Sequence, residues 1–112
     1  MDGINAKTGA RLVGIDHLRQ SVRDILTTPI GSRVMRRDYG SRLFELVDRP
    51  YSANTRLAFI AATVEALLAW EPRIAIDQVA LRSFEPGLVT LDLTGRYLPE
   101  GRPITLEGLQ IS

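Results

Sequence analysis

The apolar residues of this 112-residue chain change their spacing once, at Pro72, and this change constrains the fold more than any other feature. Before Pro72 they recur every three or four residues, which is the period of an α-helix with one buried face. After Pro72 they alternate with polar residues, which is the period of a half-buried strand. The order predicts an α+β fold, with N-terminal helices packed on a C-terminal antiparallel β-meander of about three strands.

The first helix is predicted between residues 16 and 28. Asp16 is a suitable N-cap, because its side chain can accept hydrogen bonds from free backbone N–H groups. Pro29 disfavours helical conformation in the residue before it, so the helix should end near Thr28. Residues 1–14 hold three glycines and show little periodicity, and they predict a flexible N-terminal arm. Residues 15–112 then form a single domain, because no linker or internal repeat divides them.

Two further helices are predicted before Pro72. Ser41 can cap a short one that closes before Pro50, and Ser52 can cap a long one that ends at Trp70. The long helix is expected to bury one apolar stripe. The residues of that stripe are Leu57, Ile60, Ala61, Val64, Leu67 and Leu68.

The strands are separated by two turn signals, Glu85-Pro86-Gly87 and Pro99-Glu100-Gly101. In the first strand the alternation changes phase near Asp77-Gln78, which predicts a β-bulge. The core-facing residues expected in the second and third strands are Val89, Leu91, Leu93, Tyr97, Ile104, Leu106 and Ile111.

The sequence contains no motif of a known catalytic or metal site, although carboxylates are plentiful. The chain has no cysteine, and its one histidine, His17, falls in the first turn of a predicted helix. No nucleophile-elbow, P-loop or zinc-protease motif occurs. We therefore expect no catalytic residue, no metal and no cofactor. A small peptidoglycan-degrading, lysozyme-like enzyme is the alternative, because such enzymes need only a pair of carboxylates in a cleft. The candidate carboxylates are Asp38, Glu45, Asp48, Glu65 and Glu71.

The net charge of +1 argues against a nucleic-acid-binding protein, which would need a strongly basic surface. Of the fourteen basic residues, Lys7 is the one lysine and the rest are arginine. Arginine is enriched at protein interfaces, so the bias suggests protein partners, although a GC-rich genome explains it equally well. No apolar run reaches membrane-spanning length, and the N-terminus lacks the apolar core of a signal peptide. We expect a soluble protein with neither nucleic-acid nor membrane partners.

Two short stretches combine residue types that are typical of interfaces. The first is the loop Arg33-Val34-Met35-Arg36-Arg37-Asp38-Tyr39, where three arginines stand beside Met and Tyr. The second is Trp70-Glu71-Pro72-Arg73, where Pro72 fixes a corner between the long helix and the first strand. Glu71 and Arg73 can pair with each other or with a partner. An exposed pair contributes only about 0 to 1 kcal/mol, so Glu71→Ala and Arg73→Ala should leave the fold intact. A solvated loop and a purely structural corner are the alternatives.

These stretches carry a resemblance to a known family. The pattern T-P-x-G-x-R-x-M-R-x-D-x-G at residues 28–40, followed by W-E-P-R at residues 70–73, resembles the small baseplate wedge proteins of contractile tails. That family includes the W-type baseplate assembly proteins of P2-like phages and the small baseplate subunit of type VI secretion systems. Order, spacing and chain length agree, and the likeness spans residues 14–98.

The resemblance implies a structural role without catalysis. Family members lie in the inner baseplate, bind larger wedge proteins and help to initiate the tail sheath. The implied partners are larger wedge proteins and the sheath subunit, with tail tube or hub proteins as further candidates. The implied location is the tail baseplate of a virion assembled in the bacterial cytoplasm. The implied partner-binding residues are Trp70, Glu71, Pro72, Arg73, Arg33, Arg36, Arg37, Asp38 and Tyr39.

The third predicted strand offers a place for the sheath to attach. Around Thr105 and Leu106 it carries few of the charges that usually block an exposed edge. An open edge suits the addition of a partner strand through main-chain hydrogen bonds. The resemblance points the same way, because it implies sheath subunits that join one another by exchanging strands. We therefore predict that Thr105 and Leu106 form an edge for a sheath strand. Cover by residues 1–14 is the alternative.

Overall fold

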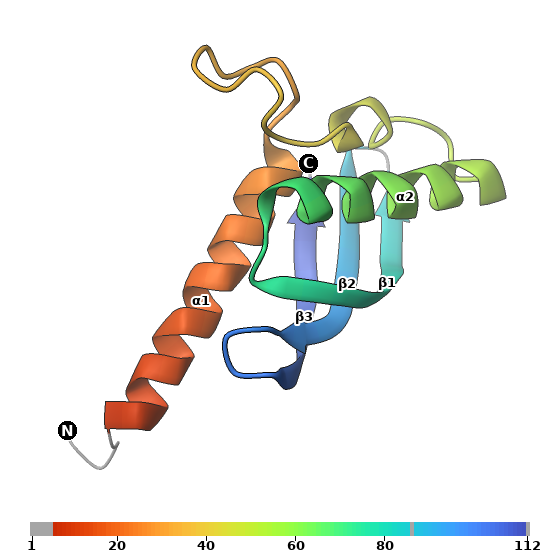
Figure 1. Ribbon diagram of the computed structural model, residues 1–112. Helices are drawn as coiled ribbons and strands as arrows, with labels where there is room; N and C mark the ends of the chain where they lie inside the picture. Colours follow the sequence, from red (N-terminus) through yellow and green to blue (C-terminus); the bar gives the residue numbers. More distant parts are fainter. Residues whose placement is uncertain (1–5, 86, 112) are drawn as a thin grey trace.

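The computed structural model describes residues 6–85 and 87–111, with side chains from residue 14 onward. The elements are helix α1 (Ala6–Thr27), a 3-10 turn η1 (Leu43–Glu45), helix α2 (Ala53–Trp70) and strands β1 (Ile74–Glu85), β2 (Leu88–Tyr97) and β3 (Arg102–Ile111). The strands form one antiparallel sheet in the order β1-β2-β3 (Figure 1). The predicted α+β fold with a three-stranded meander is confirmed.

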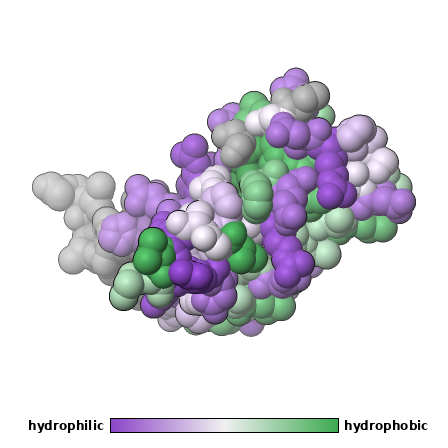
Figure 2. Space-filling model, turned by 90° about the horizontal axis from the view of Figure 1, so that it is seen from above, coloured by the Kyte–Doolittle hydropathy of each residue, from purple (hydrophilic) through white to green (hydrophobic). Residues whose placement is uncertain are grey.

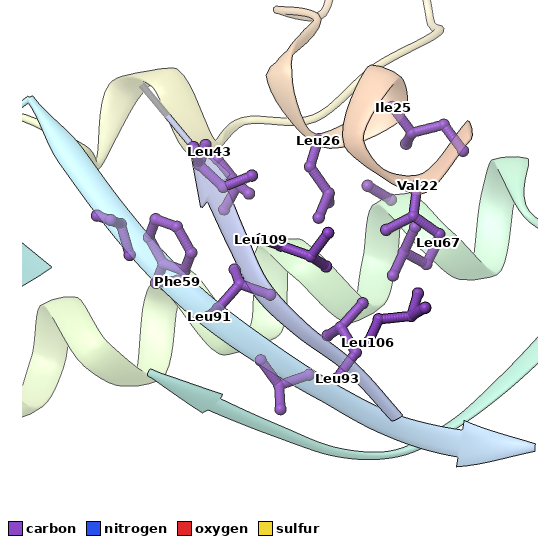
Figure 3. Close-up of a cluster of buried hydrophobic side chains, with 14 of the residues drawn as sticks. Val22, Ile25, Leu26, Leu43, Phe59, Leu67, Leu91, Leu93, Leu106 and Leu109 are labelled. Carbon is purple, nitrogen blue, oxygen red and sulfur yellow. The ribbon is translucent and has the colours of Figure 1, made fainter. Parts of the chain in front are cut away.

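The core lies between the helices and one face of the sheet (Figure 3). The opposite face is polar, and there Arg82 of β1 forms ion pairs with Asp92 of β2 (3.0 Å) and Glu107 of β3 (3.1 Å). One cation therefore links all three strands. The core-facing alternation predicted for β2 is confirmed. The most deeply buried core residues are Leu18, Val22, Ile25, Leu26, Leu43, Phe59, Leu67, Val89, Leu91, Leu93, Leu109 and Ile111.

The predicted bulge near Asp77 is confirmed, since the pairing of β1 with β2 shifts register between Ile76 and Gln78. Gly95 of β2 lies opposite Ile76. A Cβ on Gly95 would lie 2.1 Å from the carbonyl oxygen of Ala75, so the two strands approach too closely there for any side chain.

Helix α1 begins at Ala6, so the prediction that Asp16 caps its start is wrong. Asp16 is an exposed residue in the middle of the helix. Of the predicted arm, the part from Ala6 onward is helical, and residues 1–5 lie outside the described residues. Gly14 of this helix lies against the side chain of Tyr97. A Cβ at this position would lie 3.0 Å from the Tyr97 hydroxyl oxygen, which is tighter than an ordinary van der Waals contact.

Helix α2 is capped as predicted, because the side-chain oxygen of Ser52 accepts a hydrogen bond from the backbone N–H of Thr55 (3.1 Å). Half of the predicted stripe is confirmed: Leu67 is buried, and Ile60 and Val64 pack against the core. The other half is wrong, because Leu57, Ala61 and Leu68 are exposed, and the helix also buries Phe59, which was not predicted. Apolar residues surround most of this helix, and spacing alone does not decide which face meets a sheet.

Candidate partner-binding surface

The loop between α1 and η1, residues 28–41, which we call the Arg loop, projects from one end of the molecule and is fixed at its base (Figure 1). The backbone N–H of Ser41 donates to the carbonyl oxygen of Thr28 (2.9 Å), and its buried hydroxyl donates to the carbonyl oxygen of Leu26 (2.7 Å). Gly40 has φ +117°, and a Cβ there would lie 2.2 Å from the carbonyl oxygen of Thr28. Only glycine lets the two ends of the loop meet in this way.

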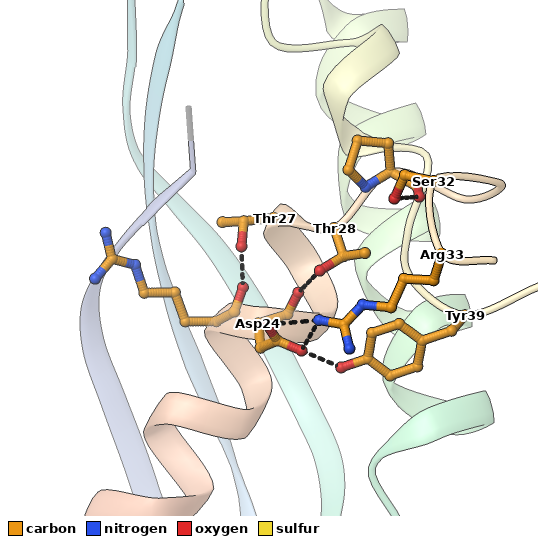
Figure 4. Close-up of polar contacts among 8 residues, drawn as sticks. Asp24, Thr27, Thr28, Ser32, Arg33 and Tyr39 are labelled. Atoms are coloured by element: carbon orange, nitrogen blue, oxygen red, sulfur yellow. Dashed lines mark hydrogen bonds and ion pairs between the residues drawn. The ribbon is translucent and has the colours of Figure 1, made fainter. Parts of the chain in front are cut away.

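Asp24 of α1 holds two of the predicted site residues in place (Figure 4). Nη2 of Arg33 donates to both carboxylate oxygens at 3.1 Å, and the hydroxyl of Tyr39 donates to the same carboxylate. The guanidinium of Arg33 also lies over the Tyr39 ring, 4.7 Å from its centroid. Burial and then the hydrogen bond to Asp24 raise the pKa of Tyr39 to about 12, so the phenol remains a donor at neutral pH. Sequence reasoning missed Asp24 as a site residue.

Tyr39 joins the loop to the second stretch through Trp70. The two rings form an edge-to-face contact with centroids 5.2 Å apart. The guanidinium of Arg36 lies 5.6 Å from the centroid of the Trp70 ring, at cation–π distance. The structure therefore brings Arg33, Arg36, Tyr39 and Trp70 together in one stack.

The corner residue Glu71 is buried. Its side chain, 2% exposed, accepts hydrogen bonds from Nε (2.9 Å) and Nη2 (3.2 Å) of Arg73, and it is also hydrogen-bonded to Ser21 of α1. Burial acts to raise the pKa of Glu71, but the hydrogen bonds from Arg73 and Ser21 outweigh it and hold the pKa below its ordinary value. The expectation of an exposed pair is therefore wrong for Glu71. The pair ties α1 to the corner between α2 and β1.

The outer side of this surface consists of residues that the fold leaves open to solvent. Arg37 and Asp38 are exposed, and neither forms a hydrogen bond or ion pair with another described residue. Pro72 is also exposed. At the tip of the loop, Val34 and Met35 are 84% and 93% exposed, although sequence reasoning did not select them as site residues. Figure 2 looks down on this end of the molecule and shows hydrophobic patches between hydrophilic ones.

Strand β3 lies at an edge of the sheet, where it was predicted. Thr105 is exposed and pairs with Thr94 of β2, whereas the side chain of Leu106 is buried in the core. Helix α1 lies beside β3, and Nη2 of Arg19 donates to the carbonyl oxygen of Gly108 (3.4 Å). The helix thus contacts the strand near Gly108.

The described residues contain no group of three or more His, Cys, Asp or Glu that could hold a metal ion, and none of their helices is long and apolar enough to cross a membrane. Among the described residues, Glu71 is the only carboxylate that is buried. Its pKa is lowered, whereas the acid of a glycosidase needs a raised one.

Comparison with known proteins identifies the family. The family model for baseplate wedge protein gp25 matches residues 13–98, which include both short stretches. The chain belongs to this family. It is 43% identical to baseplate protein W of Escherichia phage P2 over 105 residues, which cover 93% of this chain and 90% of that protein. The resemblance inferred from the two stretches is confirmed.

Two solved structures have a similar fold, and the first of them supports the family assignment. A chain of the pyocin R2 baseplate after contraction is 46% identical with a TM-score of 0.63, covering 73% of this chain and 83% of that one. A candidate tail lysozyme of Geobacter sulfurreducens is 28% identical with a TM-score of 0.71, covering 83% of this chain and 86% of that one. The chain is a structural wedge subunit of a contractile-tail baseplate.

Proposed function

We propose that this wedge subunit has no catalytic activity and binds larger wedge proteins through the surface formed by the Arg loop and the Trp70–Arg73 corner. The contact between Tyr39 and Trp70, 5.2 Å between ring centroids, carries this proposal. It joins two stretches that are distant in sequence into one braced surface. A braced surface loses less conformational entropy when it binds, so more of its contact energy appears as affinity.

The predicted residues divide into two roles within this surface. Arg33, Arg36, Tyr39 and Trp70 hold the loop in shape, and Glu71 orients Arg73. The residues that meet the partner are then Arg37, Asp38, Pro72 and the part of Arg73 that remains exposed.

Binding to the larger wedge proteins of the same tail tests the proposal. Arg37→Glu should weaken that binding at least about tenfold, because an interfacial charge is reversed. The melting temperature should not change, since Arg37 has no partner among the described residues. Arg96→Glu is the matched control, because Arg96 is exposed on the polar face of the sheet. Full binding by Arg37→Glu, or equal loss in the control, would contradict this assignment.

We also propose that the free edge of β3 accepts a strand of the sheath, with assembly in the cytoplasm of the host bacterium. Pro103 lies within β3 and has no N–H, which suits a position whose nitrogen points away from β2. Backbone N–H groups of residues two apart in a strand point the same way. Thr105 is two residues after Pro103, so its N–H is expected to point away from β2, toward the free edge. Leu106 then contributes through its buried side chain, which anchors the strand.

Thr105→Pro tests the edge, because it should remove an outward donor and spare the pairing of β3 with β2. Sheath attachment should fail while wedge assembly continues, and Thr105→Val, which keeps the donor, should behave as wild type. Electron microscopy of tails would show the difference. Normally sheathed tails carrying Thr105→Pro would exclude this edge as the attachment site.

Peptidoglycan hydrolysis is the second candidate, because of the likeness to the candidate tail lysozyme. The lowered pKa of Glu71 and its internal ion pair oppose it. Purified protein should release no muropeptides from peptidoglycan. Turnover that a single carboxylate substitution abolishes would establish the enzyme instead.

A further inference from the structure

The tip of the Arg loop exposes an adjacent apolar pair, Val34 and Met35. No other large hydrophobic side chain among the described residues is as exposed as either of them. Turns stand on both sides: the N–H of Ser32 donates to the carbonyl oxygen of Pro29 (3.1 Å), and the N–H of Tyr39 donates to that of Arg36 (3.1 Å). The pair is thus presented on a loop whose base and flanks are hydrogen-bonded.

The arginines of the loop are largely engaged within the molecule. Arg33 is held by Asp24 and lies on Tyr39, and Arg36 lies on Trp70. Reaching a partner's charges would break these contacts. The groups that remain available at the tip are therefore Val34, Met35, Arg37 and Asp38.

Building on the proposed function, we propose that Val34 and Met35 form an anchor that inserts into an apolar pocket of a larger wedge protein. A few well-buried side chains commonly supply most of the affinity of an interface. Valine is stiff at χ1 and so loses little freedom, while the unbranched thioether of methionine adapts to an irregular pocket. The charge of Arg33 is balanced by Asp24, but Arg36 lies on the uncharged Trp70 ring and keeps its positive charge. With Arg37 beside the tip, two positive charges stand against the one negative charge of Asp38. The rim of the pocket is therefore expected to be acidic.

The double variant Val34→Ser/Met35→Ser tests the anchor. Its Kd for the larger wedge proteins of the same tail should rise at least about tenfold, as for central interface residues. Its melting temperature should equal that of the wild type, because both side chains are almost fully exposed. The matched control is Leu57→Ser/Leu68→Ser, which removes two exposed leucines from the outer face of α2 and should bind as wild type.

The salt dependence of the binding rates separates the contribution of the apolar pair from that of the charge on Arg37. Loss of the apolar pair should speed dissociation at every salt concentration, whereas Arg37→Glu should chiefly slow association and change its salt dependence. If Val34→Ser/Met35→Ser binds as tightly as the wild type, or if the leucine control loses as much affinity, the anchor proposal is wrong. The proposed function would still stand if Arg37→Glu weakened binding. Failure of the wild type to bind wedge proteins would overturn both proposals.

A lipid surface is the other kind of partner that an apolar tip with nearby arginines could meet. Vesicles of phosphatidylethanolamine and phosphatidylglycerol should not bind the wild-type protein. Vesicle binding that the tip variant abolishes would replace the protein pocket with a membrane.

Discussion

Removing Arg73 should destabilise the fold far more than the exposed position of a corner residue would suggest. Arg73→Ala leaves the carboxylate of Glu71 buried, without the two hydrogen bonds of 2.9 and 3.2 Å. Breaking a buried pair on one side costs about 3 to 5 kcal/mol. Ser21 remains as a donor and Arg73 is itself 35% exposed, so the lower end, about 3 kcal/mol, applies. At about 4 °C per kcal/mol for a chain of this size, the melting temperature should fall by about 12 °C.

Glu71→Gln is the informative companion. The amide keeps nearly the same shape and can still accept from Arg73, whose charge is partly solvated, so the cost should be about 1 kcal/mol. Combining Glu71→Gln with Arg73→Ala should cost less than the sum of the single changes, since no buried charge is left unpaired. Urea unfolding followed by circular dichroism gives all three free energies. Additive costs would refute the internal ion pair.

The pH dependence follows from the lowered pKa of Glu71. Its ordinary value is 4.5 and its folded value lies below this, so the carboxylate stabilises the protein above pH 4.5. This stability is lost as the pH falls through the folded pKa. In Arg73→Ala the buried carboxylate loses its partner and its pKa should rise, so the gap to wild type should narrow in acid. A gap that is the same at pH 7 and pH 4, or a melting temperature lowered by under about 3 °C, would refute the reasoning.

Three further substitutions test the close contacts. Gly40→Ala places a Cβ against a carbonyl oxygen at positive φ and should cost about 1 to 3 kcal/mol in urea unfolding; a wild-type midpoint would show that the base of the loop is not fixed. Gly95→Ala should disrupt the pairing of β1 with β2 and lower the melting temperature by about 8 °C or more. Gly101→Ala is its control: the new Cβ would meet nothing within 4 Å, so the substitution should cost only about 1 kcal/mol, for the positive φ. Tyr39→Phe removes the hydrogen bond to Asp24 and should cost about 1 kcal/mol by urea unfolding, with no loss expected if that bond is absent in solution.

Features that depend on neighbouring residues in the chain were predictable from the sequence. The cap at Ser52, the change of phase at Asp77 and the alternation of β2 each follow from local stereochemistry, and the structure agrees. The short helix predicted before Pro50 exists as the 3-10 turn Leu43–Glu45, but its N-cap is Arg42, so the prediction that Ser41 caps it is wrong. The Ser41 hydroxyl oxygen does accept a hydrogen bond from the N–H of Leu43 (3.3 Å). Pairing within a meander follows almost directly, because consecutive strands neighbour each other.

Features that depend on tertiary packing were not predictable in this way. Helix α2 has apolar residues on several sides, and the side that faces the core carries Phe59, whose ring centroid lies 6.1 Å from that of Phe84 of β1. Likewise, the sequence W-E-P-R does not show that Glu71 turns inward, because the donor that reaches it, Ser21, comes from another helix. Family motifs located the candidate surface but could not separate residues that brace it from residues that face outward.

The bracing of the Arg loop limits how this surface can be moved between proteins. The loop owes its shape to Asp24 before it and to Trp70 at the far end of α2. A chimera that received residues 28–41 alone would have the sequence of the motif but not its conformation. The smallest portable unit is the loop together with the last turns of α1 and α2, so in this fold recognition specificity is inherited as a block that spans three segments of the chain.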